Sequence, residues 1–265
     1  MSKYEAHAVR TLHTTRHFSS RIHSLFKAHW RATLQCIDDS GLGQNDRVLD
    51  YGCGEMPFKS VLTDRGCEVA GADFAGNPHA VFEVGPKGEL DPDLTAKFDA
   101  VLSTQVLEHV SDPSYYLKEA HRVLKPQGLL LLSTHGHYCY HADPTDYWRW
   151  THEGLKLQVE RAGFDIIRFY GVFSPFQTAL QMLQDSIITK LPRGIRTLYV
   201  ICFQLCISAI GKFQKVPPQK DALLYLVTAS KQKDKLSDSA GESARELNEE
   251  HRSGTVTKGT ITGGS

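Results

Sequence analysis

The segment VLDYGCGEMPF, Val48–Phe58, joins a short apolar run to a glycine turn and then to a predicted helix. The acid Asp50 ends the apolar run, and Gly52 and Gly54 form the turn. Glycine is needed where a backbone reverses sharply or must approach a ligand closely. In an α/β sheet, nucleotides bind where a strand gives way to a helix in this manner. The segment therefore predicts a nucleotide site at the end of the first strand.

The spacing of the turn separates two kinds of cofactor. A dinucleotide fingerprint reads GxGxxG, and here its third position is Pro57, so that match fails. The pattern D-x-G-x-G instead suits a nucleoside with no phosphate against the turn. Asp73 ends the next apolar run, EVAGAD, at the distance where an acid can accept hydrogen bonds from both ribose hydroxyls. Asp50 can fix the turn or accept a hydrogen bond from a cationic amine.

Apolar strands alternate with helical patterns along most of the chain. The runs EVAGAD, AVFEV, FDAVLSTQ, LLLLSTHG, FDIIRFYGVF and ALLYLVTASK predict further strands, so we expect an α/β, doubly wound, mostly parallel sheet. We expect an N-terminal helical cap at 1–45, the main domain at 46–231, and a helical insertion at about 175–215 before the last strand. Residues 232–265 are polar and Gly/Thr/Ser-rich, which predicts a disordered tail.

The composition excludes several classes of protein. Thirty Lys plus Arg balance thirty Asp plus Glu in 265 residues, and zero net charge argues against a broad nucleic-acid-binding surface. The six cysteines are scattered without a CxxC pair, which indicates reduced thiols. The N-terminus has no apolar core like that of a signal peptide. We therefore expect a cytoplasmic protein that does not bind nucleic acid.

Four segments together resemble the class I S-adenosylmethionine-dependent methyltransferases: VLDYGCG, GADFAGN, FDAVLSTQVLEHVSDP and EAHRVLKPQGLLLLSTHG. They are closest to the small-molecule type that includes the ubiquinone-biosynthesis methyltransferases. The resemblance covers roughly residues 46–170 and the final strand. It implies a seven-stranded Rossmann-like fold, S-adenosyl-L-methionine as cofactor, and methyl transfer to a small-molecule acceptor.

The resemblance also implies a set of cofactor-binding residues. The glycine turn would line the methionine and ribose end of the cofactor, the acid after the second strand would hold the ribose hydroxyls, and the following positions would flank the adenine or contact the methionine. These residues are Asp50, Tyr51, Gly52, Gly54, Asp73, Phe74, Leu90, Thr104 and Gln105. His109, in the LEH turn, either faces the methyl donor or acceptor or only orients the loop.

The stretch STHGHYCYHADPTDYWRWT, Ser133–Thr151, follows the fifth strand and so begins beside the predicted cofactor site. A hydroxyl acceptor needs a base, and a neutral histidine such as His135 or His141 can serve near pH 7. A metal held by His135, His137, His141 and Asp143 is disfavoured, because this spacing matches no metal motif and methyl transfer needs no metal. The segment PTDYWRWT reads as an aromatic plug, in which Asp146 and Arg149 can pair.

The run LYVICFQLCISAI, Leu198–Ile210, is apolar nearly all round and has basic residues before and after it. It is shorter than the roughly 20 residues of a membrane span. A buried helix is the favoured interpretation, while peripheral membrane or lipid contact and a dimer interface stay open. Two alternatives to a small-molecule acceptor also stay open. One is a glycan or lipid-linked acceptor at a membrane surface, and the other is a non-catalytic binding module.

Overall fold

The computed structural model describes residues 19–213 and 220–232. The chain divides into two units, Met1–Lys231 and Gln232–Ser265. The predicted disordered tail lies outside the described residues from position 233 onward.

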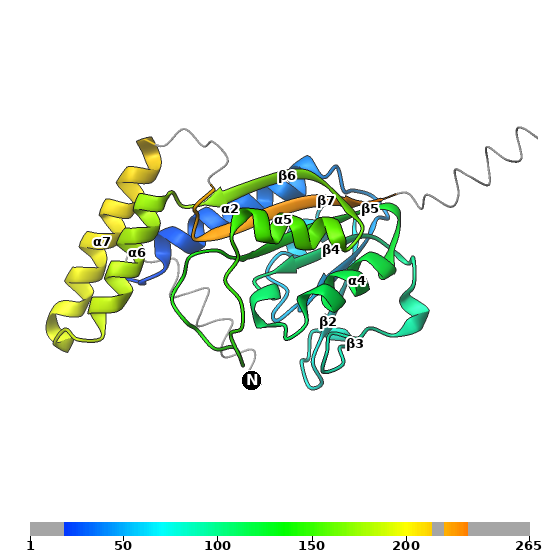
Figure 1. Cartoon of the computed structure of the whole chain (residues 1–265), viewed down its shortest axis with the longest axis horizontal. Helices are drawn as coiled ribbons and strands as arrows, with labels where there is room; N and C mark the ends of the chain where they lie inside the picture. The colour runs from blue at the N-terminus through cyan, green and yellow to red at the C-terminus, as the bar shows by residue number, and fades with distance from the viewer. Residues whose placement is uncertain (1–18, 214–219, 233–265) are drawn as a thin grey trace, which may run out of the picture. The chain divides into compact units, whose positions relative to one another are not determined.

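A seven-stranded sheet forms the centre of the first unit. Its strands are β1 (Arg47–Tyr51), β2 (Glu68–Asp73), β3 (Ala80–Glu83), β4 (Phe98–Thr104), β5 (Leu124–His135), β6 (Phe164–Val172) and β7 (Leu224–Lys231). The strand order is β3-β2-β1-β4-β5-β7-β6 (Figure 1), and β7 alone runs opposite to the other six strands. The expected doubly wound, mostly parallel sheet of seven strands is therefore confirmed.

Helices cover both faces of the sheet. They are α2 (His23–Asp39), α3 (Lys59–Thr63), α4 (Pro113–Val123), α5 (His152–Arg161), α6 (Pro175–Ile188) and α7 (Arg193–Phe213), with short 3₁₀ turns at Pro92–Leu94 and Leu107–His109. α4 and α5 lie on one face and α2 on the other (Figure 1). The central strands β1 and β4 are buried on both sides, as parallel strands covered by helices must be. Val101 packs in the cluster under α4 and α5, for example, while the adjacent Leu102 packs in the cluster under α2.

The helix starts follow their local sequence. Asp112 accepts a hydrogen bond from the Tyr115 amide at 3.0 Å, and Pro113 occupies the first turn of α4. Thr151 caps α5 by accepting from the Gly154 amide at 3.1 Å. Such caps satisfy amide donors that have no partner within the helix. These local signals explain why the two helices begin at Pro113 and His152.

The topology brings the predicted site residues to one edge. β1, β2, β4 and β5 are parallel, so the turns that follow them meet at their carboxyl ends. β7 is antiparallel to both β5 and β6, so β6 points in the same direction as β5. α6 begins three residues after β6 ends, and the α6–α7 hairpin therefore leaves the sheet at the edge that carries the predicted site.

The favoured expectation of a buried helix at Leu198–Ile210 is wrong. The helix is longer, Arg193–Phe213, and only 17% of its apolar window Arg193–Lys212 is buried. Leu198 is 65% exposed and Leu205 is 50% exposed. α7 packs against α6 and the start of α2 rather than between strands, which leaves most of its surface uncovered.

Candidate functional site

The glycine turn after β1 requires glycine for two separate reasons. Gly52 has φ +75°, and a Cβ placed there would lie 2.5 Å from Cγ2 of Val106. Gly54 has φ +49° with open space around it. Side chains other than glycine rarely adopt these backbone angles. The turn can therefore approach a ligand closely, and its backbone amides are held in place by the next strand, where Gly52 N donates to Ala72 O at 2.8 Å.

The acid that ends β2 is fixed to this turn. The Asp73 carboxylate accepts from Gly54 N at 2.8 Å and from Asn77 Nδ2 at 2.7 Å. Asn77 Nδ2 also donates to Gly54 O at 2.8 Å, so it connects the acid to the turn. Sequence reasoning missed Asn77, although it stands in the quoted segment GADFAGN. The arrangement holds a carboxylate in a defined orientation beside the turn, as recognition of a ribose requires.

Asp50 is a buried acid within the same site. Burial raises its pKa to about 8, and the nearby Asp73 charge adds to the shift. A carboxyl with such a pKa is mostly protonated at neutral pH, and an incoming cation would favour its charged form. The position is thus suited to a positively charged ligand group.

Two of the predicted cofactor residues turn their side chains into the core. Tyr51 is buried, stacks on Tyr116 with ring centroids 4.0 Å apart, and its hydroxyl donates to Gly88 O. Leu90 is buried, and its backbone amide donates to Glu119 of α4 at 3.0 Å. Both side chains are occupied by packing, so we leave them out of the proposed site. Phe74, in contrast, is half exposed just after β2, where its ring can meet a planar base.

The turn after β4 contacts the end of β5. Gln105 follows Thr104 with φ +58°, and its Nε2 donates to Ser133 Oγ at 3.0 Å. His29 of α2 reaches the same hydroxyl, with its Nε2 2.9 Å from Ser133 Oγ. Burial and the nearby His135 lower the pKa of His29 to about 4, so it is neutral at physiological pH. Sequence reasoning missed His29, which comes from the N-terminal helix.

A buried carboxylate holds a histidine at the end of β5. Glu108 Oε1 lies 2.5 Å from His135 Nδ1, and Oε2 accepts from Thr134 Oγ1 at 2.7 Å. Burial by itself would raise the pKa of Glu108, but the hydrogen bonds from His135 and Thr134 outweigh it and hold the pKa below its ordinary value. Glu108 is therefore charged. The His135 ring also stacks on Tyr138, with centroids 5.0 Å apart and planes within 7°.

The other two predicted histidines surround this pair. His141 packs edge-on against His135 with ring centroids 4.5 Å apart, and His109 packs against His141 at 5.0 Å. His109 Nδ1 donates to Thr145 O at 2.7 Å, which fixes its ring. Burial, and then His135 and His109, lower the pKa of His141. The structure thus brings all three predicted catalytic histidines into one cluster around Glu108.

The residues of the disfavoured metal alternative do not come together as a group. His137 faces Asp221 at 3.5 Å, away from the cluster. Glu108, His135 and His141 do place one potential ligand atom each within 4.8 Å of one another. The contact between Glu108 and His135 is a direct hydrogen bond, and the proton on Nδ1 occupies the lone pair that a metal would use. The prediction that the protein uses no metal stays a prediction.

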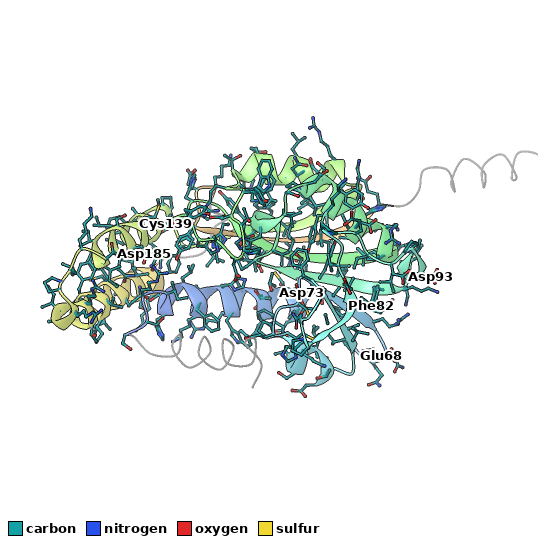
Figure 2. The ribbon with its side chains drawn as sticks, turned by 90° about the horizontal axis from the view of Figure 1, so that it is seen from below. Glu68, Asp73, Phe82, Asp93, Cys139 and Asp185 are labelled. Carbon is teal, nitrogen blue, oxygen red and sulfur yellow. The ribbon has the colours of Figure 1, made fainter. Side chains whose placement is uncertain are left out.

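The aromatic plug is confirmed by its contacts. Arg149 donates to both oxygens of Asp146 at 2.5 Å and to the carbonyl oxygens of Tyr138 and Cys139. The amide of Trp150 donates to His135 O at 3.1 Å, and its side chain is buried in the core. These bonds fasten the loop after β5 onto the domain. Figure 2 shows Cys139 of this loop and Asp185 of α6 near the hairpin, with Asp73 further along the sheet.

Comparison with known proteins decides the family. A family model described as "Methyltransferase domain" matches residues 21–168, which include the glycine turn, the acid after β2 and the Glu108–His135 pair. The chain belongs to the class I S-adenosylmethionine-dependent methyltransferases.

Curated relatives of this methyltransferase include ubiquinone biosynthesis O-methyltransferases. The one from Ruegeria pomeroyi is 34% identical over 152 residues, which are 48% of this chain and 59% of that relative. The one from Dechloromonas aromatica is 36% identical over 114 residues, or 38% of this chain and 49% of that relative. The chain thus matches about half the length of these curated relatives.

Solved structures share the fold of this methyltransferase. An S-adenosylmethionine-dependent methyltransferase from Mesorhizobium loti has a TM-score of 0.51 at 17% identity, over 77% of this chain and 98% of that one. A Haemonchus contortus phosphoethanolamine N-methyltransferase bound to S-adenosylhomocysteine has a TM-score of 0.51 at 18% identity, over 77% of this chain and 53% of that one. The [4+2]-cyclase SpnF has a TM-score of 0.52 at 23% identity, over 77% and 81%.

The methyltransferase cofactor, S-adenosylmethionine, fits the residues at this edge. The carboxylate of Asp73, set by Gly54 and Asn77, is placed to accept from ribose hydroxyls, and the exposed ring of Phe74 suits an adenine. Asp50 suits the positive charge of the cofactor. Gly54 N and Asn77 hold the carboxylate of Asp73 in this orientation.

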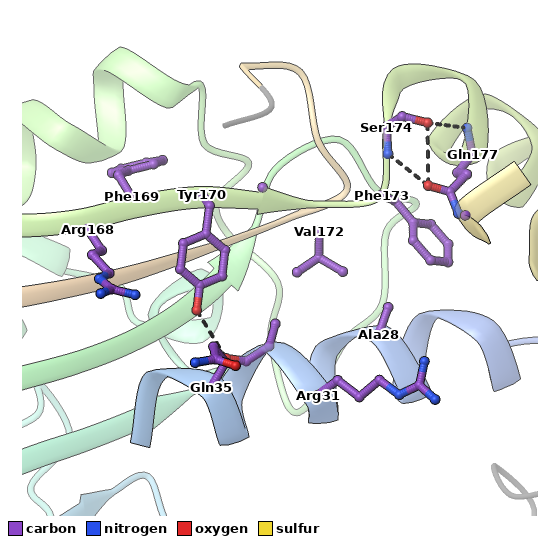
Figure 3. A pocket seen from close by; sticks show the side chains of 13 residues that line it. Ala28, Arg31, Gln35, Arg168, Phe169, Tyr170, Val172, Phe173, Ser174 and Gln177 are labelled. Atoms are coloured by element: carbon purple, nitrogen blue, oxygen red, sulfur yellow. Dashed lines mark hydrogen bonds between the residues drawn. The ribbon is translucent and has the colours of Figure 1, made fainter. Parts of the chain in front are cut away.

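A separate cavity of about 690 Å³ lies between α2 and β6 (Figure 3). Its lining includes Arg31, Gln35, Tyr170, Phe173 and Gln177, and none of the predicted site residues. We therefore locate the methyltransferase site from the glycine turn and the Glu108–His135 pair rather than from this cavity.

Proposed function

We propose that the protein transfers a methyl group from S-adenosylmethionine to a hydroxyl oxygen of a small-molecule acceptor in the cytoplasm. The observation that carries this proposal is the pairing of Glu108 with His135 at the carboxyl end of β5. An oxygen acceptor must lose its proton, and a positioned histidine can take it. The curated relatives, which are named as O-methyltransferases, support the same acceptor atom.

The pair has the geometry of a base and its orienting group. Because Glu108 is charged, it accepts the proton on Nδ1 of His135, and this leaves the lone pair on Nε2 free to receive a proton. The stacked ring of Tyr138 and the hydrogen bond from Thr134 to Glu108 prevent rotation of the two side chains. When bound, S-adenosylmethionine supplies an electrophilic methyl group. The protein's part is then to align the acceptor oxygen and remove its proton.

Replacement of Glu108 by glutamine tests the assignment. A glutamine amide can donate to Nδ1 of His135 and so favour the tautomer with its proton on Nε2, which cannot act as a base. We expect kcat to fall by roughly 10²- to 10⁴-fold, the range of general-base catalysis. Cofactor affinity, measured by calorimetry, should stay close to that of the wild type. Thr134→Val removes the other hydrogen bond to the same carboxylate and serves as the matched control with a smaller loss. Wild-type turnover in Glu108→Gln would contradict the proposal.

A second candidate is a glycan or lipid-linked acceptor at a membrane surface. The observation that favours it is a contact between the loop that follows β5, here called the acceptor loop, and the exposed α6–α7 hairpin. Tyr138, which stacks on His135, places its hydroxyl 3.5 Å from Asp185 of α6. A cofactor-consumption screen against hydroxylated metabolites, sugars and lipid intermediates distinguishes the two acceptor classes. Consumption with lipid intermediates alone would favour the second.

A non-catalytic cofactor-binding module is the remaining alternative. The fold by itself does not decide this point, because SpnF, a cyclase, has a similar fold. The intact glycine turn and the oriented Asp73 support cofactor binding, while the buried Glu108–His135 pair supports catalysis. Cofactor binding by calorimetry without any consumption in the screen would favour the module.

A further inference from the structure

The α6–α7 hairpin is built with its polarity reversed. In water, an amphipathic helix turns its apolar side inward and its polar side to solvent. In this hairpin the buried side chains of α6 are three amides and a hydroxyl, and Gln204 is buried on α7. Large apolar side chains of both helices are instead exposed. Figure 1 shows the hairpin extending beyond the end of the sheet, away from α4 and α5.

The interior of the hairpin is a connected polar network. Gln204 of α7 is fully buried, and its Nε2 donates to Oε1 of Gln184 at 2.8 Å. Its Oε1 accepts from the Ser24 amide of α2 at 2.8 Å. Gln181, also fully buried, donates to Arg21 O at 2.8 Å and to Asp185 at 3.0 Å. Such a network tolerates surroundings of low dielectric because its members find partners inside the protein.

The outer surface carries large apolar side chains along both helices. On α7 the exposed apolar side chains fall at helical spacing on one side, and they are Ile195, Leu198, Cys202, Leu205, Cys206 and Ala209. On α6, Phe176 and Leu183 are also exposed. A soluble monomer rarely leaves so continuous an apolar stripe in water. The stripe therefore indicates that something covers it.

The charges of the hairpin indicate what covers it. Across residues 175–213 the sequence has four basic residues and a single acid, Asp185. Asp185 is turned inward, with only 5% of its side chain exposed, whereas Lys190, Arg193 and Lys212 are exposed. An apolar face bordered by basic residues is the pattern of a segment that lies on an anionic lipid surface.

The lengths of the helices decide how the hairpin would meet a bilayer. The window Arg193–Lys212 has 20 residues and is long and apolar enough to cross a membrane. A hairpin that crosses and returns needs both helices to span, and each needs about 20 residues. α6 has only 14 residues. The hairpin is therefore suited to lie in the interfacial region rather than to cross.

We propose that the α6–α7 hairpin is a docking element that seats its apolar outer face in the surface of an anionic phospholipid bilayer. The inference deepens the second acceptor class given under Proposed function, on which its link to catalysis rests. Because α6 also contacts Tyr138, docking would place the acceptor loop at the membrane surface.

Co-sedimentation of the full chain with lipid vesicles tests the proposal. We expect binding to vesicles of phosphatidylcholine mixed with phosphatidylglycerol, and weak binding to phosphatidylcholine alone. Leu198→Gln/Leu205→Gln should lower the partition coefficient roughly tenfold or more, since apolar burial drives interfacial binding. Leu157→Gln/Ile167→Gln is the matched control, because these residues are 46% and 55% exposed but lie off the hairpin. The control should bind like the wild type.

Three outcomes would overturn the docking proposal. The first is no vesicle binding by the wild type, and the second is an equal loss of vesicle binding in both double variants. The third is a wild type that binds no vesicles and is a dimer that becomes a monomer in Leu198→Gln/Leu205→Gln, which would make the stripe a contact between two copies. Vesicle binding needs no turnover. Failure of methyl transfer with vesicle binding intact would therefore overturn the proposed function and leave the docking element standing.

Discussion

Proton release on cofactor binding is a sensitive test of the site, because it depends on one buried carboxyl. Asp50 is buried, and burial together with the nearby Asp73 raises its pKa to about 8. At pH 7 its protonated form is then about nine-tenths of the population. A bound cation favours the carboxylate and lowers that pKa. We therefore expect S-adenosylmethionine to displace the proton from Asp50.

The size of the effect follows from the pKa. If binding lowers the pKa of Asp50 well below 7, the cofactor releases about 0.9 proton at pH 7, about 0.5 at pH 8 and about 0.1 at pH 9. Because Asp50 loses its proton when the cofactor binds, the affinity for the cofactor rises with pH. Between pH 7 and pH 9 this contribution strengthens binding about tenfold, or about 1.4 kcal/mol.

Isothermal titration calorimetry measures the release directly. Titrations in phosphate and in Tris differ in heat by the number of protons released multiplied by the difference in buffer ionisation enthalpy. The α-amine of the cofactor titrates in the same range, so the quantity to compare is the difference between the wild type and Asp50→Asn. Asparagine keeps the size of the side chain but carries no titrating proton. Equal release and equal pH dependence in both proteins would refute the assignment of Asp50 to the cofactor's charge.

Four further outcomes are expected. Gly52→Ala should lower the unfolding temperature more than Gly54→Ala, because both need positive φ but only the first brings a Cβ into contact with a neighbouring side chain; equal shifts would contradict this. Asp73→Ala should weaken cofactor binding by roughly 1–3 kcal/mol, measured by calorimetry, and unchanged affinity would exclude its role. Arg149→Lys should destabilise the protein by roughly 1–2 kcal/mol in urea unfolding, because lysine cannot pair with both oxygens of Asp146; unchanged stability would exclude the plug. Turnover should survive dialysis against EDTA, and a loss restored by a divalent cation would make the histidine cluster a metal site.

The fold could be predicted from the sequence because its signals are local. Strand, glycine turn and acid follow one another within one short stretch from Asp50 to Asp73, and caps such as Asp112 and Thr151 mark where helices begin. Successive parallel strands need crossovers, so the turns that follow parallel strands meet at one edge of the sheet. For the same reason the three catalytic candidates meet: His109 follows β4, and His135 and His141 follow β5.

The partners of these residues could not be predicted, because they come from distant parts of the chain. His29 meets Ser133 across 104 positions, and no local pattern connects them. One signal was available: His29 lies four positions after Leu25 and three after Phe26, on the apolar side of the predicted N-terminal helix. A polar ring on the side of a helix that should be buried needs a hydrogen-bond partner. Asn77 gave a weaker signal, because short polar residues are common in turns.

The hairpin shows a different limit of sequence reasoning. Leu198–Ile210 is apolar, and apolarity alone favours burial in the protein core. The contrary signal lay in the preceding helix, where Gln177, Gln181 and Gln184 recur at spacings of four and three and so share one face. A helix whose amides share a face next to an apolar helix predicts a polar seam with the apolar surface outside. Only the pairing of the two helices shows which side is covered.

The fold alone does not decide chemistry here, because a cyclase and two methyltransferases have structures similar to this one. What must differ among such proteins is the set of groups that face the acceptor. In this chain the groups proposed to face the acceptor are coupled: Glu108 orients His135, His135 stacks on Tyr138, and Tyr138 approaches Asp185 in the polar interior of the hairpin. A shift of α6 on docking would therefore move the ring that rests on the proposed base.

If the hairpin docks on lipid as proposed, turnover should depend on the vesicle surface through this chain of contacts. Tyr138→Leu should then abolish that dependence while leaving vesicle binding intact, and a vesicle effect that persists in Tyr138→Leu would show that the two sites act independently.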